Sequence, residues 1–202
     1  GAGMLAIQST DSRAATLAHT LVNSSVGPGI AKISLQQPWP AQTPTILAAL
    51  KQSQPELYKR IGTVFFCKDY INYFLTSIIS TDVTDMSGAG MLQLPETSYS
   101  VELLEHYGIV ELAGSLPTLV VSDQVIGAVS EFAAGLTGLV AGTPVVAGLF
   151  DVVASAIGSG ILHEGETCVI AGTWSINEVL SSDVRRDNSP FITCGFPGGL
   201  FL

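Results

Sequence analysis

The chain has 202 residues, of which 47% are hydrophobic and 12% are charged, and its formal net charge is -9. Only 8 lysines and arginines are spread over this length, which argues against a nucleic-acid-binding surface, because such a surface needs clustered positive charge. The hydrophobic content suffices for a globular core. The apolar run 138–150 is interrupted by glycine and proline and falls short of the roughly 20 residues of a membrane-spanning helix.

The first part of the chain predicts mostly helices joined by loops. A short strand is expected over 4–8 and a helix over 9–22, because Ser, Thr and Asp occupy the positions of a helix cap. A loop is expected over 23–42. A helix over 43–52 has proline near its start, and 53–56 opens a further helical turn.

The middle of the chain predicts a strand over 61–66, which is β-branched and aromatic, and a helix over 68–77. Segment 78–100 is dense in Asp, Ser, Thr and Gly, so we expect a loop with at most a short strand. An amphipathic helix over 100–108 is capped by serine and closed by glycine.

Strands and helices continue to alternate toward the end of the chain. A strand over 126–130 precedes a helix over 131–138, and a strand over 143–150 precedes a helix over 151–162. Segment 166–180 predicts two strands joined by a turn at Ala171-Gly172-Thr173. This alternation favours an α/β architecture.

Asp151 is the only charged residue of the segment 142–160, which is otherwise almost entirely apolar or small. Burying an ionised carboxylate without a partner costs on the order of several kcal/mol. We therefore expect Asp151 either to be exposed to solvent or to have a function. If a strand ends at Phe150, Asp151 lies at a strand exit and at a helix start, where α/β proteins place ligand-contacting residues. It is therefore either a helix cap or a general base.

Three further features offer candidate binding residues. The turn at Gly172 and Thr173 exposes backbone amides that could hold a phosphate oxygen, although such turns are also common in hairpins. Asp11 and Arg13 could together bind vicinal hydroxyls of a polyol, or could form a surface ion pair. Trp39 lies between two prolines and could form the wall of a sugar pocket or fill a gap in the core.

Other chemistries find no support in the sequence. Neither the G-x-S-x-G motif of serine hydrolases nor a Walker loop occurs. The three histidines have no second histidine or cysteine at ligand spacing, so we expect no metal site of their own. The three cysteines lie in apolar surroundings and are predicted to be reduced core thiols, which, with no signal peptide at the start of the chain, favours a cytoplasmic protein. The histidines are His19, His106 and His163, and the cysteines are Cys67, Cys168 and Cys194.

An ordered series of segments resembles the FGGY family of carbohydrate kinases, with greatest similarity to its L-xylulose kinase branch. The segments are STDSRA (9–14), QPELYKRIGTVFFCKDYINYFLT (54–76), TDVTDMSGAGML (81–92), GLTGLVAGTPVVAGLFDVVASAIGSG (135–160) and VIAGTWSINE (169–178). The resemblance runs from about Met4 to the end of the chain and implies a fold of two ribonuclease-H-like, actin-type ATPase lobes.

The resemblance also implies functions for individual residues. Asp151 would be the base that takes the proton from a sugar hydroxyl. The nucleotide phosphates would face the turn formed by Gly172, Thr173 and Trp174, and ATP with Mg²⁺ would be the cofactors. The sugar, a ketopentose such as L-xylulose, would contact Asp11, Arg13, Trp39, Gln42 and Phe150.

The family pattern is incomplete in this sequence. Family members begin with an Asp-Gly-Gly or Asp-Gly-Thr turn that handles magnesium and phosphate, and they continue into a glycine-rich ATP lobe. We therefore expect residues 1–165 to form most of the N-terminal sugar-binding lobe and residues 166–202 the first strands of the ATP lobe. The low charged fraction also fits a piece of a longer kinase, which would not turn over ATP by itself. The sequence is compatible with a homodimer and does not fix the oligomeric state.

Two alternatives remain open at this point. The chain could be a non-catalytic sugar-binding or regulatory module of the same fold. It could also belong to another group of actin-like ATPases, such as the acyl-phosphate kinases, although STDSRA (9–14) and QPWPAQ (37–42) argue against this.

Overall fold

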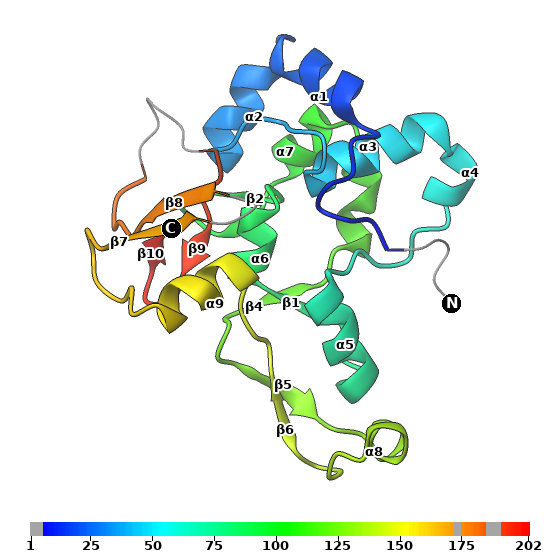
Figure 1. Cartoon of the computed structure of the whole chain (residues 1–202). Coiled ribbons are helices and arrows are strands. Elements are labelled where there is room, and N and C mark those ends of the chain that lie inside the picture. The colour runs from blue at the N-terminus through cyan, green and yellow to red at the C-terminus, as the bar shows by residue number, and fades with distance from the viewer. Residues whose placement is uncertain (1–5, 172–174, 185–190) are drawn as a thin grey trace. The chain divides into compact units, whose positions relative to one another are not determined.

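The computed structural model describes residues 6–171, 175–184 and 191–202 (Figure 1). The chain forms two compact units, each assembled from separate stretches of sequence. Unit 1 comprises residues 1–64, 86–116 and 184–194, and unit 2 comprises residues 65–85, 117–183 and 195–202. The boundary predicted at residue 165 separates the two lobes expected from the family resemblance, not these two compact units. It stays a prediction.

Unit 1 is mostly helical, and its first helices pack on one another. Helix α1 (Ala15–Val22) contacts α2 (Gly27–Ser34) and α3 (Thr43–Ser53), which leads into the short α4 (Pro55–Tyr58). Proline lies in the first turn of α3, where it costs no backbone hydrogen bond, and the helix buries an apolar face. The predicted helices over 43–52 and at 53–56 are confirmed.

The rest of unit 1 supplies a small hairpin and a second group of helices. The antiparallel strands β2 (Leu92–Gln93) and β3 (Ser98–Tyr99) precede α7 (Val101–His106) and the 3₁₀ helix η1 (Val110–Ser115). Ser100 Oγ accepts a 3.2 Å hydrogen bond from the backbone of Leu103 and caps α7 as expected.

A buried network of polar side chains joins these elements of unit 1. Gln36 Nε2 donates to the carbonyl oxygens of Ser87 and Thr193, at 2.8 and 2.9 Å. Gln42 Nε2 donates to Gln36 Oε1 at 3.1 Å. Gly90 has a φ of +72°, and a Cβ atom there would clash with Gln42 Nε2. The network therefore occupies the space beside Gly90.

Unit 2 is built around helix α5 (Cys67–Thr76), which contacts β1 (Ser80–Asp82) and the hairpin of β5 (Val125–Ala128) and β6 (Pro144–Val146). Strand β1 pairs in parallel with β4 (Thr118–Val120). Figure 1 shows α8 (Glu131–Thr137) at the end of the β5–β6 hairpin; it is capped by Ser130 and closed by Gly138 at a φ of +78°.

The last part of unit 2 contains α9 (Asp151–Gly158) and two hairpins. Strands β7 (Thr167–Ala171) and β8 (Ser175–Val179) pair antiparallel, in a register from Thr167 opposite Val179 to Ala171 opposite Ser175. Strands β9 (Gly195–Phe196) and β10 (Leu200–Phe201) also pair antiparallel. The predicted strands within 166–180 are confirmed.

Four predictions on elements of unit 1 are wrong. Residues 6–8 form no strand, and α1 begins six residues later than expected, because the Asp11 carboxylate accepts the Arg13 backbone N–H and holds the chain in a turn. The expected loop over 23–42 contains α2: its Gly29 lets the helix approach His106 of α7, where a Cβ atom would meet the imidazole at 2.5 Å. No strand forms over 61–66; Val64 N–H donates to Ser115 instead.

Three predictions that concern unit 2 also need correction. The expected loop over 78–100 contains a helix, α6 (Val83–Gly88), which begins in unit 2 and ends in unit 1. The strand expected over 143–150 ends at Val146, because Gly148 adopts a φ of +84° that a strand does not allow. Finally, Cys67 is exposed and Cys168 half-buried, so these two are not core thiols, and no disulfide joins the three cysteines.

Candidate active site

Asp151 is the first residue of α9 in unit 2, and its side chain is exposed to solvent. The carboxylate oxygen Oδ1 accepts a 2.8 Å hydrogen bond from the backbone N–H of Val152. The preceding Phe150, with a φ of -56° and a ψ of 138°, is the residue at the N-cap position. The exposed carboxylate is therefore accessible to a ligand as a hydrogen-bond acceptor.

The segment before Asp151 is fixed by hydrogen bonds from several parts of unit 2. The backbone N–H of Ala147 donates to the carbonyl oxygen of Gln124 at 3.0 Å, and that of Gly148 donates to Ser122 at 2.9 Å. Asn72 Nδ2 of α5 donates to the carbonyl oxygen of Ala147 at 2.8 Å. These bonds continue from the end of β6 toward α9 and hold a segment that has no regular secondary structure.

The N–H of Phe150 is bound by a side chain, while its carbonyl oxygen accepts from the backbone N–H of Ala154 at 2.9 Å. The Phe150 N–H donates a 2.8 Å hydrogen bond to the hydroxyl oxygen of Thr84, and that hydroxyl donates to Asp82 Oδ2 at 2.5 Å. Asp82 Oδ2 also accepts from Ser122 Oγ at 2.8 Å and from the backbone N–H of Thr84 at 2.9 Å. The Asp82 side chain thus caps the start of α6 and orients the Thr84 hydroxyl.

Asp82 is also part of a buried group of charges that we call the Lys68 cluster: Lys68, Asp69, Asp82 and Asp85. Lys68 Nζ lies 2.6 Å from Asp69 Oδ1, 2.9 Å from Asp82 Oδ1 and 3.5 Å from Asp85 Oδ2. The side chains of Asp69 and Asp82 are almost completely buried, whereas that of Lys68 is 21% exposed. One ammonium therefore neutralises three carboxyl groups only in part.

This imbalance appears in the pKa values of the cluster. Burial alone would lower the pKa of Lys68, but its hydrogen bonds to Asp69 and Asp82 outweigh this effect and the pKa is raised. Burial raises the pKa of Asp85 to about 7; the charges of Asp69 and Asp82 add to the increase and Lys68 opposes it. The cluster therefore holds Lys68 charged while Asp85 is partly protonated near neutral pH.

Reasoning from the sequence missed the Lys68 cluster, Thr84 and Ser122. From the sequence, Lys68 and Asp69 are expected only as part of a helix, and Asp82 and Thr84 only as part of a loop. A usable signal is present, because Asp82 is a residue type preferred at helix caps and Asp85 lies in the first turn that follows it. No signal in the sequence links these residues to Phe150, which lies 66 positions from Thr84.

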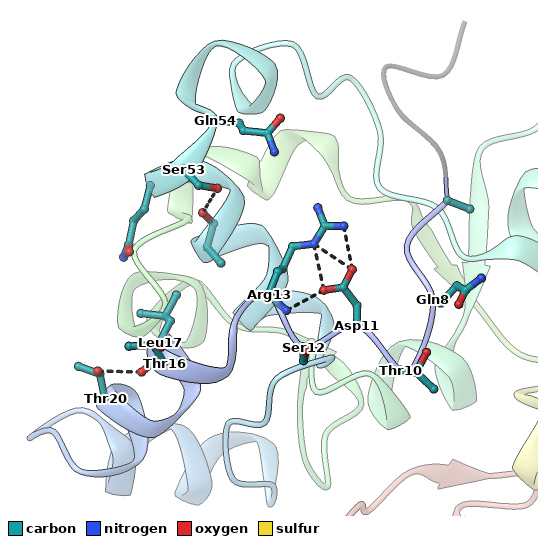
Figure 2. A pocket seen from close by; sticks show the side chains of 13 residues that line it. Gln8, Thr10, Asp11, Ser12, Arg13, Thr16, Leu17, Thr20, Ser53 and Gln54 are labelled. Carbon is teal, nitrogen blue, oxygen red and sulfur yellow. Dashed lines mark hydrogen bonds and ion pairs between the residues drawn. The ribbon is translucent and has the colours of Figure 1, made fainter.

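Asp11 and Arg13 lie in unit 1, where they line a pocket of about 1430 Å³ (Figure 2). Arg13 Nε donates to both carboxylate oxygens of Asp11, at 3.0 and 2.9 Å, and its Nη2 lies 2.8 Å from Oδ2. The hydrogen bond from Arg13 lowers the pKa of Asp11, so the pair stays charged. Further polar side chains face the same pocket, namely Gln8, Thr10, Ser12, Thr16, Thr20, Gln52, Ser53 and Gln54.

The other predicted sugar contacts have different surroundings. Trp39 is half-buried in unit 1, and its ring lies 5.4 Å from that of Phe191. Gln42 is 1% exposed, and its Oε1 accepts from Tyr107 at 2.9 Å in addition to its bond to Gln36. These contacts assign Gln42 to the internal packing of unit 1. Phe150 is half-buried in unit 2.

The predicted phosphate-facing residues Gly172, Thr173 and Trp174 lie outside the described residues. Within residues 6–171, 175–184 and 191–202, no three His, Cys, Asp or Glu side chains are arranged to hold a metal ion. Over the same ranges, no helix combines the length and apolar character needed to cross a membrane.

Residues 4–158 match the N-terminal domain of the FGGY family of carbohydrate kinases, and the chain belongs to this family. The family expected from the ordered motifs is thus confirmed.

Curated relatives agree with this assignment. The "Probable L-xylulose kinase" of Pasteurella multocida (strain Pm70) is 31% identical over 198 residues, which are 97% of this chain and 41% of that protein. The L-xylulose/3-keto-L-gulonate kinase of Escherichia coli (strain K12) is 32% identical over 180 residues, which are 89% and 36% of the two chains. The chain thus spans about two fifths of the length of these relatives.

Solved structures confirm the α/β fold of the N-terminal lobe. The xylulose kinase from Rhodospirillum rubrum is 25% identical, with a TM-score of 0.87 over 96% of this chain and 40% of that one. The ligand-bound xylulose kinase from Lactobacillus acidophilus has the same TM-score and coverage at 20% identity, a likeness that concerns the fold alone.

Proposed function

We propose that this chain is the sugar-binding part of a kinase that transfers a phosphoryl group from ATP to a ketopentose such as L-xylulose. Membership of the carbohydrate kinase family supports the reaction type. The names of the relatives from Pasteurella multocida and Escherichia coli support the sugar. Because the chain spans about two fifths of those relatives, we expect activity only from the complete protein.

In this proposal Asp151 is the general base. The observation that carries the proposal is an exposed carboxylate at the first residue of α9, directly after a segment fixed by hydrogen bonds to Gln124, Ser122 and Thr84. A carboxylate at this position can accept the proton of a sugar hydroxyl as the new bond to phosphorus forms. Its hydrogen bond to Val152 occupies only part of its accepting capacity.

Asp11 and Arg13 are proposed to bind sugar hydroxyls. The fixed fork of the Arg13 guanidinium donates, the Asp11 carboxylate accepts, and both line a pocket rich in hydroxyl and amide groups. Trp39 and Phe150 remain proposed apolar contacts. The burial of Gln42 and its bonds to Gln36 and Tyr107 favour an indirect role, in which it supports the surrounding core.

ATP and Mg²⁺ are proposed cofactors, as is typical of the family. ATP would supply the phosphoryl group and Mg²⁺ would neutralise its charge. The residues predicted to face the phosphates, 172–174, lie outside the described part. The three carboxyl groups of the Lys68 cluster do not fit a resident metal, because an ammonium already lies among them.

The test is Asp151→Asn in the complete protein, that is, this chain together with its flanking coding sequence. We expect kcat for ketopentose phosphorylation to fall by about 10²–10⁴-fold, the usual contribution of a general base, while calorimetry still detects sugar binding. Asp123→Asn is the matched control, because Asp123 is also exposed in unit 2 and the same charge is removed. Equal kcat values for the two variants would contradict the proposal and leave Asp151 with only a structural role at the start of α9.

The same assay separates the proposal from the non-catalytic alternative. Coupled ADP release is measured against ketopentoses, pentitols and glycerol with the complete unsubstituted protein. A sugar-binding or regulatory module would bind one of these compounds without releasing ADP.

A further inference from the structure

The hydroxyl of Thr84 makes a hydrogen bond next to the proposed base, in a direction fixed by its neighbours. A hydroxyl has one proton to donate and two lone pairs that accept. Asp82 Oδ2 is a carboxylate oxygen 2.5 Å away and can only accept, so it takes the Thr84 proton. The Thr84 oxygen is then oriented to accept the N–H of Phe150 at 2.8 Å.

Asp82 is itself held rigidly. Its Oδ1 lies 2.9 Å from Lys68 Nζ, and its Oδ2 accepts from Ser122 at 2.8 Å as well as from Thr84. The side chains of Asp82 and Thr84 are 0% and 1% exposed, so water does not compete for these bonds. Bonds between charged and buried groups are stronger than exposed ones, which favours one arrangement of the whole set.

The bond to Phe150 acts on the backbone immediately before Asp151. The N–H groups of Ala147 and Gly148 are bound by backbone carbonyls of Gln124 and Ser122, whereas Phe150 is the residue of this segment that a side chain binds through its N–H. The backbone of Phe150 sets the direction in which α9 starts. A displacement of about 1 Å at a reacting group can cost on the order of 10²-fold in rate.

We infer that Thr84, oriented by Asp82 and the Lys68 cluster, is a positioning residue that aims the carboxylate of Asp151 at the sugar hydroxyl. This inference rests on the proposed function of Asp151. Thr84 acts through its hydrogen bond to the backbone N–H of Phe150.

The test compares Thr84→Val, Thr84→Ser and Thr81→Val in the complete kinase. Thr84→Val removes the hydroxyl and keeps the shape of the side chain, and Thr84→Ser keeps the hydroxyl. Thr81→Val is the matched control, because Thr81 is equally buried and its hydroxyl has no hydrogen-bond partner among the described residues. We expect Thr84→Val to lower kcat by about 10–100-fold with the KM for sugar changed less than about threefold, whereas the other two variants stay near the parent.

A double substitution distinguishes positioning from simple stability. Residues that act through one another lose activity non-additively. In the Asp151→Asn background we therefore expect Thr84→Val to cause no further loss of the residual rate. The inference is overturned if Thr84→Val lowers that residual rate by the same factor as in the parent, or if Thr84→Val behaves like Thr81→Val.

Two further measurements keep the inference testable. Hydrogen exchange at the Phe150 amide should be faster in Thr84→Val and unchanged in Thr84→Ser; equal protection in both would contradict the inference without reference to activity. If Thr84→Val does not fold, Ser122→Ala removes a neighbouring bond to the same Asp82 oxygen and should give a smaller kcat loss that also disappears in Asp151→Asn. Full activity of Asp151→Asn itself would overturn the proposed function, and the inference with it.

Discussion

The ammonium of Lys68 lies 2.9 Å from a carboxylate oxygen of Asp82, a side chain with no solvent-exposed surface. Removing one partner of a buried ion pair leaves the other charge without compensation, which costs more than the pair itself contributes. Lys68 is therefore expected to be necessary for the stability of unit 2.

Lys68→Met tests this expectation, because methionine keeps most of the aliphatic stem and loses the charge. We expect the free energy of unfolding to fall by about 3–5 kcal/mol, as measured by urea denaturation followed by circular dichroism. Lys59→Met is the control, since Lys59 pairs with Glu56 at 2.8 Å while both side chains are mostly exposed. That change should stay within about 1 kcal/mol, and an equal loss for both variants would contradict a special role for Lys68.

Asp85 should make stability depend on pH. Its pKa is raised from 3.8 to about 7 in the folded state by burial, with Asp69 and Asp82 adding to the increase and Lys68 opposing it. Between these two values the folded state binds a proton that the unfolded chain has released, so the contribution of Asp85 to stability decreases as the pH rises through this window.

Asp85→Asn imitates the protonated side chain and should remove this dependence. We expect the melting temperature of the variant to equal that of the parent near pH 4 and to exceed it increasingly up to about pH 8. Asp123→Asn, which changes an exposed carboxylate, is the control for the loss of one acidic side chain. A constant difference for Asp85→Asn would show that the group titrates normally.

Substitutions of Asp11 and Arg13 show whether the two residues bind sugar or form only a surface ion pair. The Arg13 side chain is 38% exposed, so water can replace its bonds and Asp11→Asn and Arg13→Gln should leave the melting temperature almost unchanged. In the complete kinase we expect each to raise the KM for sugar by about 10–100-fold, since each removes hydrogen bonds between a charged group and the substrate. Glu56→Gln, an exposed carboxylate outside the pocket, is the control; an unchanged KM for the pair would leave it a surface ion pair.

The parts of the fold that could be predicted are those whose signals are local. Helix α3 has proline in its first turn, and α7 and α8 have serine caps, Ser100 and Ser130. These features act within one helical turn, so the sequence alone reveals them.

The parts that were missed depend on contacts between distant residues. Helix α2 contains Gly29. A glycine favours a loop prediction, and only the structure shows that it lies close to His106. Phe65 lies in a segment with the composition of a strand, yet its ring stacks on that of Tyr73 of α5, with 5.5 Å between the ring centroids. In both cases tertiary packing overrides the local preference.

In the candidate site, too, local features could be predicted and contacts between distant residues could not. The expected helix start located Asp151 at the first residue of α9, as the structure has it, although the strand before it ends earlier than expected, at Val146. The Lys68 cluster could not be predicted, because charges separated in sequence normally read as solvated side chains, and only the fold encloses Lys68 between Asp69 and Asp82.

The side chain of Gln42 lies where a Cβ atom at position 90 would have to be placed. Positions 42 and 90 are therefore expected to vary together: a residue other than glycine fits at position 90 only if position 42 carries a shorter side chain. Even then the φ of +72° favours asparagine over a branched residue. Among related kinases, this pair of positions would record whether the buried amide network of unit 1 has been kept or replaced.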